Sequence, residues 1–383
     1  MKKIILLFSA VALLFSCAPK EMKITVENTA DFDRQADLVE IPVTDIKNHV
    51  TLSGNEAYTV TDANGNIIPS QITSDGKLIF QSNLKAKESG TYTVKAGTQD
   101  IYKPQTYGRF ITERKDDFAW ENDRVAFRIY GPALVAIDGP SNGIDAWYKR
   151  TNELIIDKWY KDDLAGVASY HQDHGEGQDD YKVGRSLGAG AMAPYVGDKL
   201  WLNENFASQE LIDNGPLRTT FKLNYKDLNV DGNTYTETRT ISIDAGSQLT
   251  KITQEYGNVA APMAVAAGFV KRENDSIIAS PENGYIVYAE PYSSMVDNVY
   301  LGMVFPNGFD KSIVDTYAVE NPKSKKQDSY SHVLGITKYQ PNTPVTYYTG
   351  YGWSKFGFAS FADFQKYVEN FAKGLKQPLV IKY

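Results

Sequence analysis

Cysteine, histidine and excess basic charge are all scarce in this chain of 383 residues. It has one cysteine, which excludes an intrachain disulfide and a metal site built from cysteines. Its 40 basic residues are outnumbered by 47 acidic ones, which gives a formal net charge of -7 at pH 7. No block of lysines and arginines resembles a nucleic-acid footprint. We therefore expect no nucleic-acid partner.

Long apolar runs are rare too, apart from one at the start of the chain. Two lysines precede apolar residues that extend, with one interruption, from position 4 to position 15. This pattern is typical of an export signal and is too short for a membrane-spanning helix. It ends in Leu-Phe-Ser-Cys, which resembles a bacterial lipobox. Residues 1–16 are therefore predicted to be a signal peptide, and 17–21 a tether lipidated at Cys17 that anchors a cell-envelope protein to the membrane, in the periplasm or at the outer membrane. The alternative is an ordinary secretory signal with a chance cysteine.

Aromatic residues, in contrast, are abundant: 25 Tyr, 17 Phe and 5 Trp. Sugar-binding clefts use such rings because the apolar face of a pyranose stacks on them. Aromatic side chains also fill the cores of β-sheets. The composition therefore fits both a carbohydrate-binding role and a β-rich fold.

The punctuation of the chain is that of a β-protein. Asn-Gly, Asp-Gly and Ser-Gly pairs separate short alternating runs near the N-terminus, and longer strand-like runs follow. We predict a mostly β fold with a small N-terminal β-sandwich over 22–103 and a large antiparallel β-sandwich over 104–383. By analogy with carbohydrate enzymes of that fold, the large sandwich is expected to be a mutarotase-like supersandwich. A C-terminal helix capped by Ser360 should precede Pro378, and the last residues could return as a strand.

The stretch from Ser169 to Gly190 concentrates titratable groups and holds two of the four histidines. Its glycines prevent a stable helix, so it is expected to be a loop laid over a sheet as the wall of a site. Histidine exchanges protons near neutral pH, and a neighbouring carboxylate can stabilise its cation. The alternatives are a solvated surface loop and, less favoured, a metal site of two histidines and one carboxylate. The candidate catalytic residues here are His171, His174, Glu176 and Tyr181, and the candidate substrate contacts are Asp173 and Arg185.

Two further clusters combine charge with aromatic rings. Arg109, Lys115 and Trp120 lie in the first, where an arginine fork could bind a carboxylate while an indole stacks on a sugar. A salt-bridged turn explains this cluster equally well. His332 and Trp353 lie in the second, weaker cluster, for which aromatic packing in a core is the simpler interpretation of any one residue.

These same stretches also resemble a known family. "YGRFITERKDDFAWENDRVAFRIYGP", "GIDAWYKRT", "IIDKWY" and "YHQDHGEGQDDYKVGRSLGAGAMAP" are similar to secreted or lipid-anchored Bacteroidota proteins of a domain of unknown function, found in polysaccharide-utilisation gene clusters. The resemblance covers nearly the whole chain after the signal. It implies a role in ulvan breakdown as an oligosaccharide dehydratase, which removes water from the unsaturated uronate left by a polysaccharide lyase. It assigns no catalytic residues.

Such a reaction needs a cation for the substrate carboxylate, a base and an acid. Arg109 or Lys115 could supply the cation, and His171 or His174, with Glu176 or Tyr181, the proton transfers. The hypothesis is that the loop with His171 and His174 shares one site with Arg109 and Lys115, which binds an acidic oligosaccharide and uses no cofactor and no metal. The rival functions are a polysaccharide lyase or glycoside hydrolase, for which Asp173 and Glu176 are candidate carboxylates, and a non-catalytic glycan-binding lipoprotein with a tryptophan platform.

Overall fold

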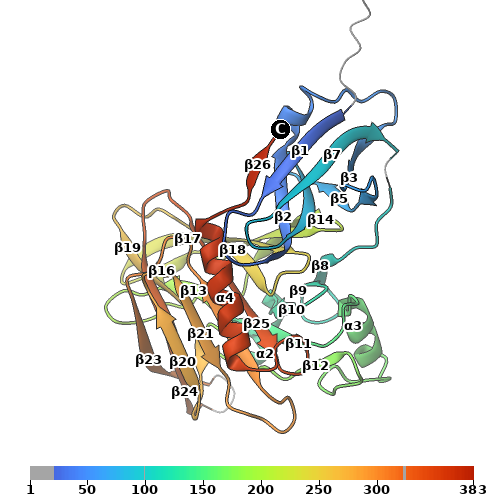
Figure 1. Ribbon diagram of the computed structural model, residues 1–383. Helices are drawn as coiled ribbons and strands as arrows, with labels where there is room; N and C mark the ends of the chain where they lie inside the picture. Colours follow the sequence, from blue (N-terminus) through green and yellow to red (C-terminus); the bar gives the residue numbers. More distant parts are fainter. Residues whose placement is uncertain (1–20, 99, 322–324) are drawn as a thin grey trace, which may run out of the picture.

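The computed structural model describes residues 21–98, 100–321 and 325–383 (Figure 1). The predicted signal peptide and Cys17 lie outside the described residues. Within them the chain is mostly β, with several antiparallel sheets and one long helix near the C-terminus, as the sequence predicts. No helix of the described part is long and apolar enough to cross a membrane.

The N-terminal part forms a small sandwich of two antiparallel sheets. Alternating residues such as Ile24, Val39, Phe80 and Val94 point inward and are buried between the sheets, since successive side chains of a strand face opposite ways. The last strand of the chain pairs with β1, so this sandwich contains both ends of the described chain. Its five-stranded sheet has the order β26 (Val380–Lys382), β1 (Glu21–Glu27), β7 (Ser89–Gly97), β3 (Ala57–Thr61) and β4 (Ile67–Ile68); the second has the order β2 (Arg34–Pro42), β6 (Lys77–Leu84) and β5 (Ser70–Ile72), and a short helix α1 (Val43–Ile46) follows β2.

The larger part is built around a nine-stranded antiparallel sheet. A four-stranded sheet and a five-stranded sheet pack on it, and aromatic side chains fill the space between. Phe118 of the five-stranded sheet stacks on Phe221 of the large sheet, with ring centroids 3.9 Å apart. The large sheet has the order β14 (Ser208–Asn214), β15 (Arg218–Asn224), β17 (Asn233–Asp244), β18 (Leu249–Gly257), β25 (Val345–Trp353), β22 (Val299–Val304), β21 (Tyr285–Ala289) and β20 (Ser276–Ser280), with β16 (Leu228–Val230) beside β17; the four-stranded sheet has the order β13 (Ala189–Pro194), β19 (Met263–Lys271), β24 (Gln327–Tyr339) and β23 (Lys311–Glu320).

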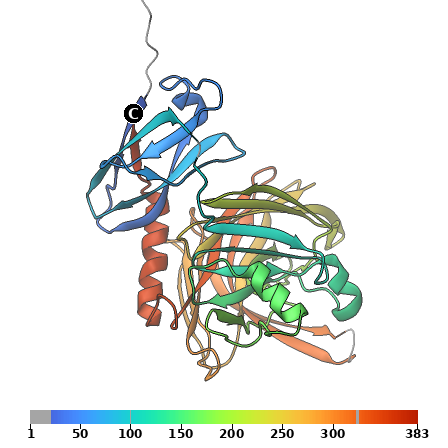
Figure 2. The same ribbon diagram turned by 90° about the vertical axis from the view of Figure 1, so that its right-hand side faces the viewer.

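The five-stranded sheet is the layer that positions the site described below. It is buried on both faces: one faces the large sheet, and helix α3 (Ile156–Leu164) covers the other (Figure 2). The residues that follow α3 return to the sheet edge as its last strand. Its order is β12 (Gly177–Asp179), β11 (Ile144–Lys149), β10 (Ala126–Ile129), β9 (Asp117–Asn122) and β8 (Thr106–Ile111), and helix α2 (Pro132–Asp138) lies between β10 and β11.

The C-terminal helix α4 (Phe361–Lys376) begins where the sequence predicts. The Ser360 side chain accepts a hydrogen bond from the backbone N–H of Asp363, and the Asp363 side chain accepts one from the backbone of Ser360. This reciprocal cap satisfies two helix-end donors. Phe364 and Val368 bury one face of the helix on β21 and β22. Beyond the helix the chain continues to β26, so α4 links the large sheet to the N-terminal sandwich (Figure 1).

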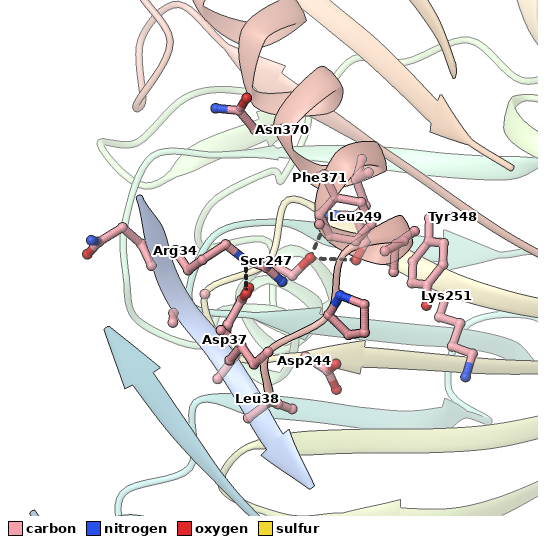
Figure 3. A pocket seen from close by; sticks show the side chains of 18 of the residues that line it. Arg34, Asp37, Leu38, Asp244, Ser247, Leu249, Lys251, Tyr348, Asn370 and Phe371 are labelled. Carbon is pink, nitrogen blue, oxygen red and sulfur yellow. Dashed lines mark hydrogen bonds and ion pairs between the residues drawn. The ribbon is translucent and has the colours of Figure 1, made fainter. Parts of the chain in front are cut away.

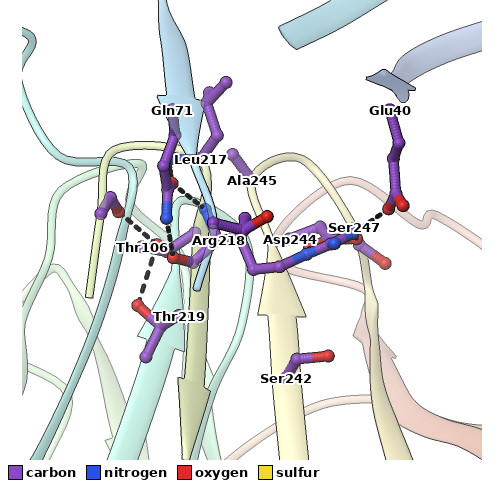
Figure 4. Close-up of polar contacts among 12 residues, drawn as sticks. Glu40, Gln71, Thr106, Leu217, Arg218, Thr219, Ser242, Asp244, Ala245 and Ser247 are labelled. Atoms are coloured by element: carbon purple, nitrogen blue, oxygen red, sulfur yellow. Dashed lines mark hydrogen bonds and ion pairs between the residues drawn. The ribbon is translucent and has the colours of Figure 1, made fainter. Parts of the chain in front are cut away.

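A set of polar contacts fixes the N-terminal sandwich on the large sheet (Figure 4). The Gln71 side chain acts as a strand partner: its oxygen accepts from the backbone N–H of Leu217 (3.0 Å) and Arg218 (2.8 Å), and its amide donates to the carbonyl of Arg218 (2.9 Å). The Arg218 guanidinium bridges Glu40 of the sandwich (2.8 Å) and Asp244 of the sheet (2.6 Å). The contact between the two parts is therefore specific in register and charge.

Replacing Gln71 by alanine should destabilise the protein by about 1–3 kcal/mol, because it leaves buried backbone donors at Leu217 and Arg218 without a partner. Gln81→Ala is the matched control, since the Gln81 amide makes a single bond across the same contact, to the carbonyl of Ala245 (2.9 Å). Denaturant unfolding of both variants measures the difference. Equal destabilisation would contradict the special role of Gln71.

Candidate active site

The outer face of the five-stranded sheet carries buried charge. Arg128 of β10 lies opposite Asp145 of β11, and Trp147 of β11 lies opposite Asp179 of β12, so these four side chains share one face. Their exposed fractions are 4% or less. Aromatic rings cover them: Trp147 contacts Trp159 and Tyr160 of α3 and Tyr170 of the following loop, at centroid distances of 5.1–5.3 Å. This aromatic cover shields the charges from bulk solvent.

One guanidinium holds two carboxyl groups at this site. Arg128 donates from Nε (3.0 Å) and Nη2 (2.6 Å) to Asp145 Oδ2, and Nη2 also donates to Asp179 Oδ2 (2.8 Å). Burial raises the pKa of Asp179 to about 7, and the charge of Asp145 adds to the rise, while Arg128 and His171 oppose it. Two carboxyl groups around one cation in a dry site therefore hold a proton near neutral pH.

Four polar atoms of this face have no hydrogen-bond partner among the described residues. They are Arg128 Nη1, Asp145 Oδ1, the indole nitrogen of Trp147 and the hydroxyl of Tyr160. In folded proteins buried polar atoms almost always have a partner, which is supplied by water or a ligand where the protein supplies none. The cluster thus has hydrogen-bonding capacity that its fold does not use.

His171 lies at the edge of this buried cluster and reaches solvent. Its side chain is 55% exposed, and its Nδ1 lies 3.0 Å from the backbone oxygen of Asp179 and 3.6 Å from the Asp179 carboxyl. A carbonyl oxygen only accepts, so Nδ1 carries the proton and Nε2 of the neutral ring is a free acceptor. The Asp179 carboxyl is placed to stabilise the imidazolium that forms when Nε2 takes a proton. The backbone oxygen of Asp179 orients the ring and the carboxyl lies beside the same nitrogen, which is an arrangement that suits a general base.

Arg114 and Tyr130 also border the buried cluster, and together with His171 they form what is called its rim below. Both are partly exposed, and the guanidinium of Arg114 lies 5.5 Å from the centre of the Tyr130 ring. Arg114 also pairs with buried Asp117 at 2.8 Å, which fixes its position. The Tyr130 hydroxyl donates to Asp145 at 3.1 Å. Burial and the charge of Asp145 raise the pKa of Tyr130, so its hydroxyl keeps its proton at neutral pH.

The other charged residues of the 169–176 loop fasten the loop. Asp173 pairs with Arg150 at 3.0 Å and accepts from the backbone N–H of Gly175 and Gly177. Glu176 pairs with Lys158 of α3 at 3.0 Å and accepts from the Trp159 indole. His174 is exposed, and its Nε2 lies 3.2 Å from the carbonyl of Ser169. Of the two histidines in the loop, His171 is therefore the one in contact with the buried charges.

The rest of the stretch diverges to other parts of the fold. Tyr181 is buried in the main hydrophobic core and not at the face that carries Arg128. The Arg272 guanidinium lies 5.3 Å from its ring centre, and the Tyr181 hydroxyl has no partner among the described residues. Arg185 donates to the carbonyl of Glu320 at 2.8 Å. His332 is fully buried and accepts from the backbone N–H of Leu187; burial lowers its pKa to about 4, so it stays neutral. His332 thus anchors the end of the stretch.

The charged residues of the predicted Arg109 cluster, and the tryptophans of both further clusters, are engaged in contacts of their own. Arg109 forks to Glu113 (2.5 Å) and to Asp157 at the start of α3 (2.6 Å). Lys115 lies 3.8 Å from Asp138. Trp120 and Trp353 are 0% and 1% exposed, within the core, so neither indole offers a face to a sugar. Arg109 thus contacts α3 through Asp157, whereas the 169–176 loop contacts α3 through the pair of Glu176 and Lys158.

Sequence reasoning did not single out Arg128, Asp145, Asp179, Arg114 or Tyr130 as the site. A usable signal was present, because Arg128 and Asp145 interrupt otherwise apolar runs, "VAFRIYG" and "GIDAWY". A charged residue inside a strand buried on both faces requires a partner on the neighbouring strand. Here that partner is the cross-strand neighbour.

The raised pKa of Asp179 predicts a pH-dependent stability. Between about pH 4 and pH 7 the folded protein holds a proton on Asp179 that the unfolded chain has lost. The free energy of unfolding should therefore fall as pH rises through this window. Denaturant titrations of the parent and of Asp179→Asn from pH 4 to 8 measure it: the parent should lose stability relative to the variant. A constant difference would show that Asp179 is not the titrating group.

A separate cleft lies away from this cluster. It has a volume of about 500 Å³ and lies between the N-terminal sandwich, the large sheet and α4, and none of the residues predicted from the sequence lines it. Within 21–98, 100–321 and 325–383, no group of three or more His, Cys, Asp or Glu side chains is arranged to hold a metal ion.

Comparison with known proteins identifies the family. The model of the domain of unknown function DUF4861 matches residues 26–381. The chain is a DUF4861 protein. It is 32% identical over 406 residues to "Uncharacterized protein P7" of Formosa agariphila, covering 100% of this chain and 99% of that protein.

Among solved structures, the DUF4861 chain is similar to a protein in glycosyl hydrolase family 38 from Enterococcus faecalis, with a TM-score of 0.53 and 8% identity. The match covers 96% of this chain and 48% of that one, so the chain spans about half the length of that structure. A heparinase III matches with 11% identity and a TM-score of 0.36, over 68% of this chain and 38% of that one, which is too low to support an argument. The likeness to the first structure concerns the fold.

Proposed function

We propose that this DUF4861 protein is a carbohydrate-active lyase that removes water from the unsaturated uronate end of an acidic oligosaccharide, with His171 as the base. The observation that carries the proposal is the His171–Asp179 pair: an exposed imidazole with its free nitrogen toward solvent, backed by a buried carboxyl. The fold likeness to a glycosyl hydrolase family protein supports a carbohydrate as the substrate class.

The rim provides the groups that an elimination needs. Arg114 supplies the cation for the substrate carboxylate, and its pairing with Asp117 holds it in place. Nε2 of His171 takes the proton from the substrate carbon, and the C–O bond to the departing hydroxyl breaks. Tyr130 gives that hydroxyl a proton, so that water leaves, and the proton on His171 returns through solvent to Tyr130. The step consumes no cofactor.

A polysaccharide lyase is the second candidate, because the same base and acid would serve if the leaving group were a glycosidic oxygen. A binding platform of tryptophans is less favoured, since four of the five tryptophans are buried: Trp120, Trp147, Trp159 and Trp353. Exposed aromatic rings are what a flat glycan-binding surface requires.

Incubation of the purified protein with unsaturated uronic oligosaccharides, followed by mass spectrometry, tests the proposal. Loss of one water that depends on His171 supports the dehydratase. Shortened chains that depend on His171 support the lyase instead. No change in mass with a panel of uronic oligosaccharides would overturn both.

Localisation is proposed from Cys17, which lies outside the described residues. Cys17→Ala should leave the protein folded but move it from the membrane fraction to the soluble fraction, because a protein with no acyl chains has no stable anchor. Fractionation of cells with an antibody against the protein measures this. A variant that stays with the membrane would show that the lipobox assignment is wrong.

A further inference from the structure

The cleft of about 500 Å³ is a concave site that lies away from the buried cluster. Figure 3 shows side chains from three parts of the fold around it. Residues 32–40 of the N-terminal sandwich form one wall, the second half of α4 and the chain beyond it form another, and the large sheet forms the floor. The volume is within the roughly 300–1,000 Å³ of small-molecule sites, which often lie where two parts of a protein meet.

The floor is a row of polar and aromatic side chains set by strand register. Ser242 of β17 lies opposite Lys251 of β18, which lies opposite Tyr348 of β25, so the three side chains stand side by side on one face of the sheet. Asp244 and Leu249 are two residues along the same strands and share that face. The floor is therefore positioned by the sheet itself.

The charges of the walls are already paired. Arg34 is bound to Asp37 and also donates to the carbonyl of Gln377 at 3.0 Å. Arg218 holds Glu40 and Asp244, as described above. The remaining acidic residue of the lining, Asp33, pairs with Lys85 at 2.7 Å. Every carboxylate of the cleft thus has a cation.

Lys251 differs from Arg34 and Arg218, the other two cations of the cleft lining. It is exposed, and no carboxylate of the described residues lies within ion-pair distance of its ammonium. The aromatic rings of Tyr348 and Phe371 stand beside it, 5.1 Å apart in an edge-on arrangement. One unpaired cation next to rings with apolar faces is the combination that recognises an acidic sugar.

We propose that this cleft binds an acidic segment of an oligosaccharide, with Lys251 pairing with its carboxylate or sulfate and with the rings of Tyr348 and Phe371 in contact with the sugar. The carbohydrate nature of the ligand rests on the proposed function, whereas the preference for an anion rests on the charges of the cleft. Because the contact at Gln71 and Arg218 fixes the sandwich on the sheet, the cleft keeps its shape without a ligand.

Calorimetric titration of the full chain tests the proposal, with His171→Ala as the background so that the ligand is not turned over. The probes are a glucuronate-containing tetrasaccharide, its sulfated form and a neutral glucose tetrasaccharide. The acidic probes should bind more tightly than the neutral one, and less tightly at high salt. Lys251→Gln should raise their Kd about fivefold, the scale of an exposed ion pair. Lys338→Gln is the matched control, an exposed strand lysine outside the cleft, and should leave the Kd unchanged.

The two proposals fail in different ways. If Lys251→Gln binds the acidic probes as tightly as its background, or if the neutral probe binds equally well, the cleft site is overturned even where the parent releases water from its substrate. If affinity depends on Lys251 but the parent changes no substrate, the cleft site stands and the proposed catalysis is overturned. A greater loss for one acidic probe than for the other tells whether a carboxylate or a sulfate is recognised.

Discussion

Replacing His171 by alanine should lower turnover by roughly a hundredfold or more, the scale of losing a general base. The imidazole is 55% exposed, so its removal leaves no cavity, and the free energy of unfolding should change by less than about 0.5 kcal/mol. Steady-state kinetics with unsaturated uronic oligosaccharides, together with denaturant unfolding, measures the two effects. A large loss of turnover without a loss of stability separates catalysis from folding.

His174→Ala is the matched control, because His174 belongs to the same loop and its ring nitrogen lies beside the Ser169 carbonyl instead of the buried carboxyl. It should keep most of the activity, and equal losses in the two variants would contradict the assignment of His171 as the base. Asp179→Asn adds a second readout. The parent should gain kcat/KM as pH rises through about 7, where Asp179 ionises and can stabilise the imidazolium, and the variant should lose this inflection.

The largest effect on stability is expected from Arg128→Met. The substitution leaves Asp145 and Asp179 buried without their cation, which should cost about 3–5 kcal/mol. Unfolding in guanidinium chloride, followed by tryptophan fluorescence, measures this loss of stability. The Trp147 ring reports on the site because it lies 5.0 Å from the guanidinium carbon of Arg128. The midpoint should fall well below that of the parent.

Two further variants test whether the stability lost in Arg128→Met comes from the buried charges. Arg124→Met removes an arginine that is 41% exposed and should cost under about 1 kcal/mol. Arg128→Met combined with Asp145→Asn and Asp179→Asn should recover part of the lost stability, because no charge is then left unpaired in the interior. If Arg128→Met were no more destabilising than Arg124→Met, the buried cluster would not have the energetic role that its geometry implies.

Much of the fold could be predicted from local pattern. Alternation and turn pairs indicate the strands, and the N-cap at Ser360 defines the start of α4 from four adjacent residues. The pairing of β26 with β1 joins residues more than three hundred positions apart, and no local signal specifies it. The N-terminal sandwich thus includes β26, a strand from the far end of the chain, which the sequence does not assign to it. The boundaries at 22–103 and 104–383 stay a prediction.

The candidate site was harder, because exposure cannot be read from residue type. His171, His174 and His332 look alike in sequence, yet one contacts a buried carboxyl, one bonds a loop carbonyl and one is fully buried. The sequence places Trp120 and Tyr181 among the candidate site residues, but both side chains are buried. The sequence indicates the loop that carries His171 but not the charges beside it, since those charges meet only when β10, β11 and β12 pair.

The strand at the C-terminus also constrains how the chain folds. The sheet that contains β1 is complete only when β26 pairs with it, and β26 is synthesised more than three hundred residues after β1. Until then one edge of β1 presents unpaired backbone groups, which are prone to pair with other chains. Such a distant pairing also slows folding, because a long loop must close before the contact forms. A chain shortened by its last few residues should therefore aggregate during folding, although its large sheet is complete.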